Sequence, residues 1–327
     1  HLIIAILLLF CGVVFASMSG NLIVVAPAFQ AAPAEAPPLW PFLFITIACG
    51  AISGFHSLVS SGTSAKQVRS ESDSLFVGYG SMLVEGALAT LVIIAVAAGI
   101  GMGYTGGSGE HLSGVAAWTN HYSSRAAAAG LGSKVSAFVD GAANMIAAIG
   151  IPRGIAVVIM GVFVASFAGT TLDTATRIQR YIVTELFTAV RIPLFRNRYV
   201  ATGFAVITAA LLAFASGADG KGALSLWPLF GAVNQTLAAL ALIIITLYLR
   251  KEGGWKWLFA GIPAVFMSTI TLWAAVLNQV SFGGDQNLLL QIINGVIIII
   301  VVWVTVEGLV QFFRPHAESN QEAATER

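Results

Sequence analysis

Residues 46–67 read TIACGAISGFHSLVSSGTSAKQ and continue an apolar segment that begins at Trp40. One ionisable side chain, His56, lies inside this apolar run. We expect the helix to break at the glycines at positions 50, 54 and 62, and hydroxyl side chains follow within and after this segment: Ser57, Ser60, Ser61, Thr63 and Ser64. Backbone that leaves helical geometry at membrane depth must be buried in protein or line a wet cavity. Such a segment is therefore typical of a transport site, and a helix that simply ends near Ser57 before a polar loop fits equally well.

Composition places the whole chain in a membrane. The 327 residues are 57% hydrophobic and 9% charged, and the mean hydropathy is +0.86. A soluble domain carries roughly 25% charged residues. The net charge of +1 argues against a nucleic-acid partner. We find no zinc-protease motif, phosphate-binding glycine loop or nucleophile elbow, so we expect a protein that is not an enzyme and has no cofactor or metal.

Apolar runs long enough to cross a bilayer, about 20 residues each, predict an all-α polytopic protein. They predict eight spans, at residues 2–27, 40–60, 75–102, 151–175, 199–216, 224–249, 257–279 and 288–311. Residues 135–150 form a further segment that is too short and too polar for a confident span. If it lies in an external cap over residues 103–150, most Lys and Arg fall on one side, which is then the cytoplasm. We therefore expect both ends of this chain in the cytoplasm.

Two ionisable groups inside the predicted spans are candidates for proton transfer. Glu85 lies about ten residues into its span, near the middle of the bilayer. It either carries a proton or stays protonated and hydrogen-bonds a neighbouring helix. An imidazole titrates in the physiological range, so His56 is a second carrier candidate, or it is a neutral group that stabilises the helix break.

A polar helix face follows within residues 166–180, SFAGTTLDTATRIQR. The side chains of Ser166, Thr170, Asp173 and Arg177 recur on one face, with Thr171 beside them. Their oxygens would suit a cation site or a gate. Alternatively, the hydroxyls bond carbonyls of their own helix, and Asp173 and Arg177 form a local ion pair.

Two amide side chains, Asn234 and Gln235, fall near mid-membrane in the stretch LWPLFGAVNQTLAAL at residues 226–240. Amides at this depth either join helices through hydrogen bonds or face a substrate. Joining helices is the simpler interpretation.

Four long stretches resemble the carbon starvation protein A (CstA) family. They are residues 41–67, residues 78–89 (GYGSMLVEGALA), residues 166–186 (SFAGTTLDTATRIQRYIVTEL) and residues 226–242 (LWPLFGAVNQTLAALAL). They stand in family order and span most of the chain between Trp40 and Ala264. Full-length family members have further helices before this region, so we expect the chain to be the C-terminal part of such a protein. The missing N-terminal part would then be its partner.

The resemblance implies a secondary transporter that imports a peptide or pyruvate, driven by a proton or possibly a sodium gradient, in a bacterial or archaeal cytoplasmic membrane. It also implies the second half of an inverted-repeat core. The expected domains are residues 1–134, with the broken helix and external loop; residues 135–313, a five-helix module; and a polar tail at 314–327. Residues assigned to substrate binding are Gly50, Gly54, His56, Ser57, Asn234 and Gln235.

Two other classes remain open on the sequence. A broken helix also serves as a signalling hinge, so the chain is alternatively a non-transporting sensor or assembly module of the starvation response. A membrane-embedded enzyme ranks third, because neither a nucleophile–base pair nor a metal set is visible.

Overall fold

The computed structural model describes residues 2–30, 38–106, 109–123, 131–215, 217–218, 220–284 and 286–314. Among these residues, six helices are long and apolar enough to cross a membrane, and α1 (Leu2–Met18) and α10 (Arg198–Ala213) are shorter apolar helices. Each of these eight segments overlaps one of the eight predicted spans, and α1 is clearly shorter than the predicted span at residues 2–27. The prediction of an all-α polytopic membrane protein is confirmed.

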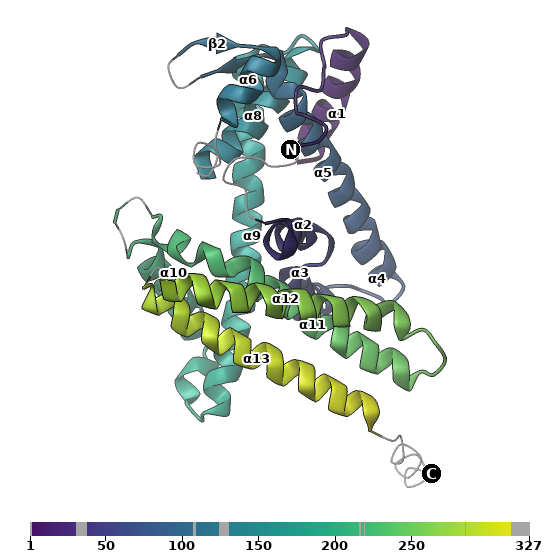
Figure 1. Ribbon diagram of the computed structural model, residues 1–327, viewed down its shortest axis with the longest axis vertical. Coiled ribbons are helices and arrows are strands. Elements are labelled where there is room, and N and C mark those ends of the chain that lie inside the picture. The colour runs from purple at the N-terminus through teal and green to yellow at the C-terminus, as the bar shows by residue number, and fades with distance from the viewer. Residues whose placement is uncertain are drawn as a thin grey trace. The chain divides into compact units, whose positions relative to one another are not determined.

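The chain forms two compact units, each made of two separate segments (Figure 1). Unit 1 comprises residues 1–36 and 67–177, and unit 2 comprises residues 37–66 and 178–327. The helix α9 (Arg153–Ala189) contributes residues to both units. The domain limits expected at residues 134 and 313 stay a prediction, as does the inverted repeat.

Unit 1 packs around α8 (Leu131–Ala147), which contacts α1, α5 and the 3₁₀ helix η4. The other elements of unit 1 are α4 (Asp73–Leu75), η3 (Phe76–Gly80), α5 (Ser81–Ala97), η4 (Gly99–Met102), α6 (Gly114–His121) and the antiparallel strands β1 (Tyr104–Thr105) and β2 (His111–Leu112). The segment expected in an external cap, 135–150, thus belongs to the core helix of this unit. Its position in a membrane stays a prediction.

Small residues let the helices of unit 1 approach closely. A Cβ on Gly12 of α1 would lie 2.7 Å from the backbone carbonyl of Met145. A Cβ on Gly141 of α8 would meet the backbone of Ala95 and lie 3.1 Å from the nitrogen of Ile100. Close helix contact through small residues is the usual packing mode inside membranes.

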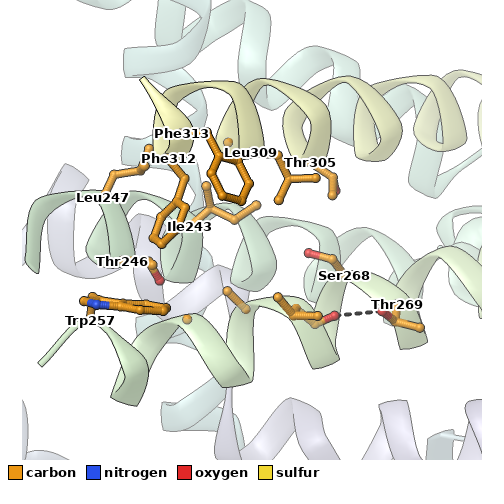
Figure 2. A pocket seen from close by; sticks show the side chains of 14 residues that line it. Ile243, Thr246, Leu247, Trp257, Ser268, Thr269, Thr305, Leu309, Phe312 and Phe313 are labelled. Atoms are coloured by element: carbon orange, nitrogen blue, oxygen red, sulfur yellow. Dashed lines mark hydrogen bonds between the residues drawn. The ribbon is translucent and has the colours of Figure 1, made fainter. Parts of the chain in front are cut away.

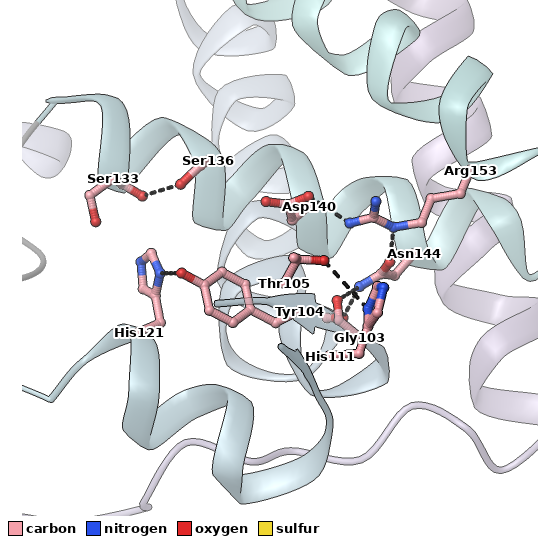
Figure 3. Close-up of polar contacts among 11 residues, drawn as sticks. Gly103, Tyr104, Thr105, His111, His121, Ser133, Ser136, Asp140, Asn144 and Arg153 are labelled. Atoms are coloured by element: carbon pink, nitrogen blue, oxygen red, sulfur yellow. Dashed lines mark hydrogen bonds and ion pairs between the residues drawn. The ribbon is translucent and has the colours of Figure 1, made fainter. Parts of the chain in front are cut away.

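A buried amide fixes the end of α5 to α8 (Figure 3). The Nδ2 group of Asn144 donates to the carbonyls of Gly99, at 3.0 Å, and Gly103, at 2.6 Å. Its Oδ1 accepts from Nε of Arg153 at 3.0 Å, and the same guanidinium pairs with Asp140 at 2.7 Å. The carbonyls at the two ends of η4, those of Gly99 and Gly103, therefore receive a partner from α8.

A buried histidine sits in the loop region of the same unit (Figure 3). Nδ1 of His121 lies 3.2 Å from the hydroxyl of Tyr104, and its Nε2 has no hydrogen-bond partner among the described residues. Burial lowers the pKa of His121, and the carboxylate of Asp140 partly opposes this shift.

Unit 2 is organised around α11 (Trp227–Lys251), which contacts α2, α3, α12 and α13. Figure 1 shows α11, α12 and α13 side by side. The other elements of unit 2 are η1 (Leu39–Leu43), α2 (Phe44–Ala51), α3 (Gly54–Gly62), η2 (Ser64–Lys66), the end of α9, η5 (Pro193–Arg196), α10, η6 (Gly222–Leu226), α12 (Leu258–Gly284) and α13 (Leu288–Phe313). Ile45 of α2 packs against Ile270 and Ala274 of α12.

Candidate functional site

The predicted broken helix is present in unit 2. Helix α2 ends at Ala51, Ile52 and Ser53 are extended, and α3 begins at Gly54. The dihedral angles are φ −137° and ψ 102° at Ile52, and φ −118° and ψ 127° at Ser53. The sequence led us to expect breaks at Gly50, Gly54 and Gly62. Helix α3 does begin at Gly54 and end at Gly62, but the break itself lies at Ile52 and Ser53 and not at Gly50. Gly50 is inside α2, and the two extended residues carry side chains.

Asn234 of α11 caps the second half of the broken helix. Its Oδ1 accepts from the backbone N–H of Phe55 at 2.8 Å and from the hydroxyl of Ser53 at 3.3 Å. A capping side chain normally stands at the residue before the helix and accepts from the second or third N–H group. Ser53 makes no such bond to the N–H groups of α3. The cap is therefore supplied by another helix, 179 residues along the chain.

The rest of the Asn234 amide faces the first half of the break. Its Nδ2 donates to Sγ of Cys49 at 3.0 Å, and the residue is only 4% exposed. The same side chain thus contacts the end of α2 and the start of α3. This geometry supports the helix-joining interpretation of Asn234. Its assignment to substrate binding stays a prediction.

Gly54 is the one glycine of this stretch that the packing demands. A Cβ there would meet the carbonyl oxygen of Asn234 and the side chain of Leu237, and would lie 2.8 Å from the nitrogen of Ala238. By contrast, a Cβ on Gly50 would have nothing within 4 Å. The start of α3 therefore lies directly on the backbone of α11, and the role of Gly50 in binding stays a prediction.

The hydroxyls of α3 bond their own helix. Ser57 donates to the carbonyl of Gly54 at 2.7 Å, and Ser61 donates to the carbonyl of Ser57 at 2.9 Å. His56 is exposed on this helix, with its ring 6.4 Å from that of Phe55. The roles proposed for His56 and Ser57 are thus neither supported nor contradicted by these contacts.

Gln235, next to Asn234 in α11, contacts helix α2. Its Nε2 lies 3.4 Å from the carbonyl of Ile45 in α2, and its Oε1 is buried without a hydrogen-bond partner among the described residues. Gln235 is fully buried. Two adjacent amides of α11 therefore contact α2, and Asn234 contacts α3 as well.

The remaining candidates lie in unit 1. Glu85 is exposed on α5. On α9, Ser166 donates to the carbonyl of Val162 at 2.8 Å, and Thr170 donates to that of Ser166 at 3.0 Å. Thr171 is exposed beside them.

An ion pair completes this face of α9. Asp173 pairs with Arg177 at 2.8 Å, four residues on. These contacts are those of the local-bonding alternative, and the cation-binding or gating assignment stays a prediction.

Sequence reasoning missed three contributors to the break: Cys49, Ser53 and the backbone of Phe55. None carries a signal by itself. The sequence did contain the amide pair at 234–235 and a broken helix that needs a cap. These two features can be connected only once the structure shows that α11 contacts α3.

Curated relatives cover this region. The peptide transporter CstA of Helicobacter pylori is 34% identical over 284 residues, which is 76% of this chain and 41% of the relative. That of Mycobacterium tuberculosis is 32% identical over 285 residues, 74% of this chain and 37% of the relative. The pyruvate/proton symporter BtsT of Escherichia coli is 32% identical over 303 residues, 75% of this chain and 42% of the relative.

The chain spans between 37% and 42% of the length of these relatives. No solved structure matches it. The sequence model of the carbon starvation protein CstA family matches residues 1–274. The chain is therefore a multi-pass helical membrane protein that belongs to the carbon starvation protein CstA family.

Proposed function

We propose that this chain is part of a secondary active transporter that imports a small organic solute, a peptide or pyruvate, across the cytoplasmic membrane. The observation that carries the proposal is the break between α2 and α3, capped by Asn234. Family membership supports it, because the relatives are named as a peptide transporter and a pyruvate/proton symporter. The chain has no enzymatic role in this proposal, and the rest of the polypeptide completes the site.

The break supplies two kinds of polar group at membrane depth. The last carbonyls of α2 and the first N–H groups of α3 lose their helical partners at Ile52 and Ser53. In transporters with interrupted helices, N–H ends face anionic substrate groups and carbonyl ends face the coupling cation. Both pyruvate and a peptide carry a carboxylate. We place that carboxylate near the start of α3, beside His56 and Ser57.

Glu85 is the first candidate for the proton carrier, and His56 is the second. A carboxyl group in an apolar helix changes charge at high cost unless it faces a cavity or a partner. The coupling ion is a proton, as in the named symporter relative, with sodium at the oxygens of Ser166, Thr170, Thr171 and Asp173 as the other possibility.

The test uses the full-length polypeptide that contains this chain, reconstituted in liposomes. Uptake of labelled pyruvate and of a labelled dipeptide is measured with and without an inward proton gradient, and then with a sodium gradient. We expect one substrate to accumulate only with a gradient. Accumulation of neither under any gradient would overturn the proposal and favour a sensor that binds without flux.

A matched pair of carboxyl variants tests the carrier. Glu85→Gln should abolish gradient-driven accumulation and leave substrate exchange intact. The control is Glu307→Gln in α13, since Glu307 lies in an apolar helix and accepts a hydrogen bond from Gln311 at 2.7 Å. Equal accumulation by wild type and Glu85→Gln would remove Glu85 from the mechanism.

A further inference from the structure

An apolar groove opens between α11, α12 and α13 at one end of unit 2 (Figure 2). It has a volume of about 250 Å³, and its lining side chains include those of Trp257, Leu309, Phe312 and Phe313. Among the described residues that line it, none is charged. The hydroxyl of Thr269 is bonded within its own helix, to the carbonyl of Val265 at 2.8 Å. The wall therefore offers mainly apolar contacts to an occupant.

The groove continues along the α12–α13 face. A second hollow shares Thr269 and Thr305 with the first and extends to Val302. From Phe313 to Val302 is eleven residues, which is about 16 Å along a helix. Half of a hydrocarbon core about 30 Å thick is about 15 Å. The groove therefore has the length of one leaflet of a bilayer.

A cationic side chain, that of Arg250, lies beside the groove and contacts one of its lining residues. The guanidinium of Arg250 lies 3.8 Å from the ring centroid of Phe312, which lines the groove. Its Nη1 is buried and has no hydrogen-bond partner among the described residues. Lys251 follows Arg250 at the end of α11, and Lys256 lies in the loop between α11 and α12. A buried charged donor without an acceptor is costly, and guanidinium matches phosphate through paired hydrogen bonds.

We propose that this groove binds one anionic phospholipid, with an acyl chain along α12 and α13 and the phosphate at Arg250. The topology predicted from the basic loops puts this end at the cytoplasmic side, and the proposal rests on that topology. The cytoplasmic leaflet is the one that carries anionic lipid, and basic pockets between helices on this side bind such headgroups. The aromatic ring of Trp257 stands at the same end, as expected for a side chain at the interface.

The test uses the full-length polypeptide in phosphatidylcholine nanodiscs that contain phosphatidylglycerol with a photoreactive diazirine in its acyl chain. After irradiation, mass spectrometry locates the labelled residues. We expect labels concentrated on groove residues such as Thr269 and Leu309. Diazirine phosphatidylcholine should label these positions no more than other exposed helix faces.

Two variants and their controls separate the headgroup from the acyl chain. Arg250→Gln should lower groove labelling by phosphatidylglycerol roughly tenfold, the loss expected for a charged hydrogen bond. Its control is Arg198→Gln, since Arg198 also lies over a ring, that of Tyr199 at 4.7 Å, but does not line the groove. Thr269→Phe fills the groove and should remove the labels, whereas Val280→Phe, at an exposed position of the same helix, should not.

Three results would overturn the proposal. The first is equal groove labelling in Arg250→Gln and wild type. The second is labelling spread evenly over all exposed helix faces, which is what bulk lipid gives. The third is a crosslink between two copies of the chain, or from the N-terminal part of the polypeptide, at Thr269 or Leu309, which would show that protein occupies the groove.

Discussion

In each unit a buried asparagine joins a helix interruption to another helix. The two side-chain amides use opposite groups to do so: one donates through its nitrogen to backbone carbonyls, and the other accepts through its oxygen from a backbone N–H. In unit 1, Asn144 donates its N–H groups to the carbonyls of Gly99, at the start of η4, and Gly103, just after η4. In unit 2, Asn234 offers its oxygen to an N–H group at the start of α3. An amide can do both because it carries two donors and an acceptor. Whether the amide donates or accepts depends on whether the neighbouring backbone presents carbonyl groups or N–H groups to it.

The partners of the two amides differ in charge. Asn144 is supported by Arg153, which also pairs with Asp140. Asn234 has neutral partners, namely Phe55, Ser53 and Cys49. Charged groups are costly in the bilayer centre, whereas a satisfied neutral amide is tolerated. The comparison shows that Asn234 joins the two halves of the break in unit 2 through neutral partners, whereas Asn144 depends on a charged one.

The largest expected effect comes from closing the space between α3 and α11. Gly54→Ala places a methyl group against the backbone of α11. Because backbone atoms cannot move aside as a side chain can, the substitution should lower the free energy of unfolding by about 3 kcal/mol. Gly50→Ala is the control, since it meets nothing within 4 Å and should stabilise α2 by up to about 1 kcal/mol. Thermal unfolding in detergent measures both. Equal midpoints for the two variants would contradict the close contact.

The next largest effect is expected when the side-chain amide of Asn234 or Asn144 is removed. Asn234→Ala leaves the N–H of Phe55 unpaired and should cost about 2 kcal/mol, and Asn144→Ala should cost a similar amount. The two residues share no partner among the described contacts, so the double variant should show the sum.

A control keeps this test specific. Thr236→Val, on the same helix as Asn234, removes a hydroxyl that bonds only the carbonyl of Ala232 at 2.8 Å, and it should change little. A double variant well below the sum would mean that the two interruptions are coupled.

The stability of unit 1 should depend on pH through His121. Burial lowers the pKa of His121, so the unfolded chain binds a proton at higher pH than the folded chain does. Stability therefore falls as pH drops below about 6.5, and the loss is complete below the folded pKa. His121→Gln should remove this dependence. Unfolding midpoints at pH 8 and pH 5.5 test it, and a wild-type midpoint that rises on acidification would reverse the sign.

The smallest effect is expected on α9. Thr170→Val removes a hydroxyl that bonds its own helix at the carbonyls of Ser166 and Phe167, each at 3.0 Å. We expect a change within about 0.5 kcal/mol in stability, as for other exposed positions. Gradient-driven uptake by the full-length polypeptide is the second measurement. A large loss of sodium-driven uptake, with stability unchanged, would favour the cation-site assignment instead.

The candidate site was only partly predictable from the sequence. The interrupted segment could be predicted, because glycine, histidine and hydroxyl residues inside an apolar run are unusual. The place of the break was not, because Ile52 and Ser53 are extended through contacts made by a residue of α11. Nor could the sequence separate Gly54 from Gly50, since only one of them lies against another backbone.

By itself, the sequence determined the membrane class, the eight apolar segments and the family. The class and the segments follow from composition and from the length of the apolar runs, because a spanning helix must match the thickness of the hydrocarbon core. The family follows from the four long stretches that resemble it. Only the tertiary structure decided which polar groups serve packing and which stay available. Asn234 caps a distant helix and Thr170 bonds its own, whereas Arg250 holds a buried donor without a partner among the described residues. Hydrogen bonds act over about 3 Å, and such proximity between distant residues arises only when the helices have packed.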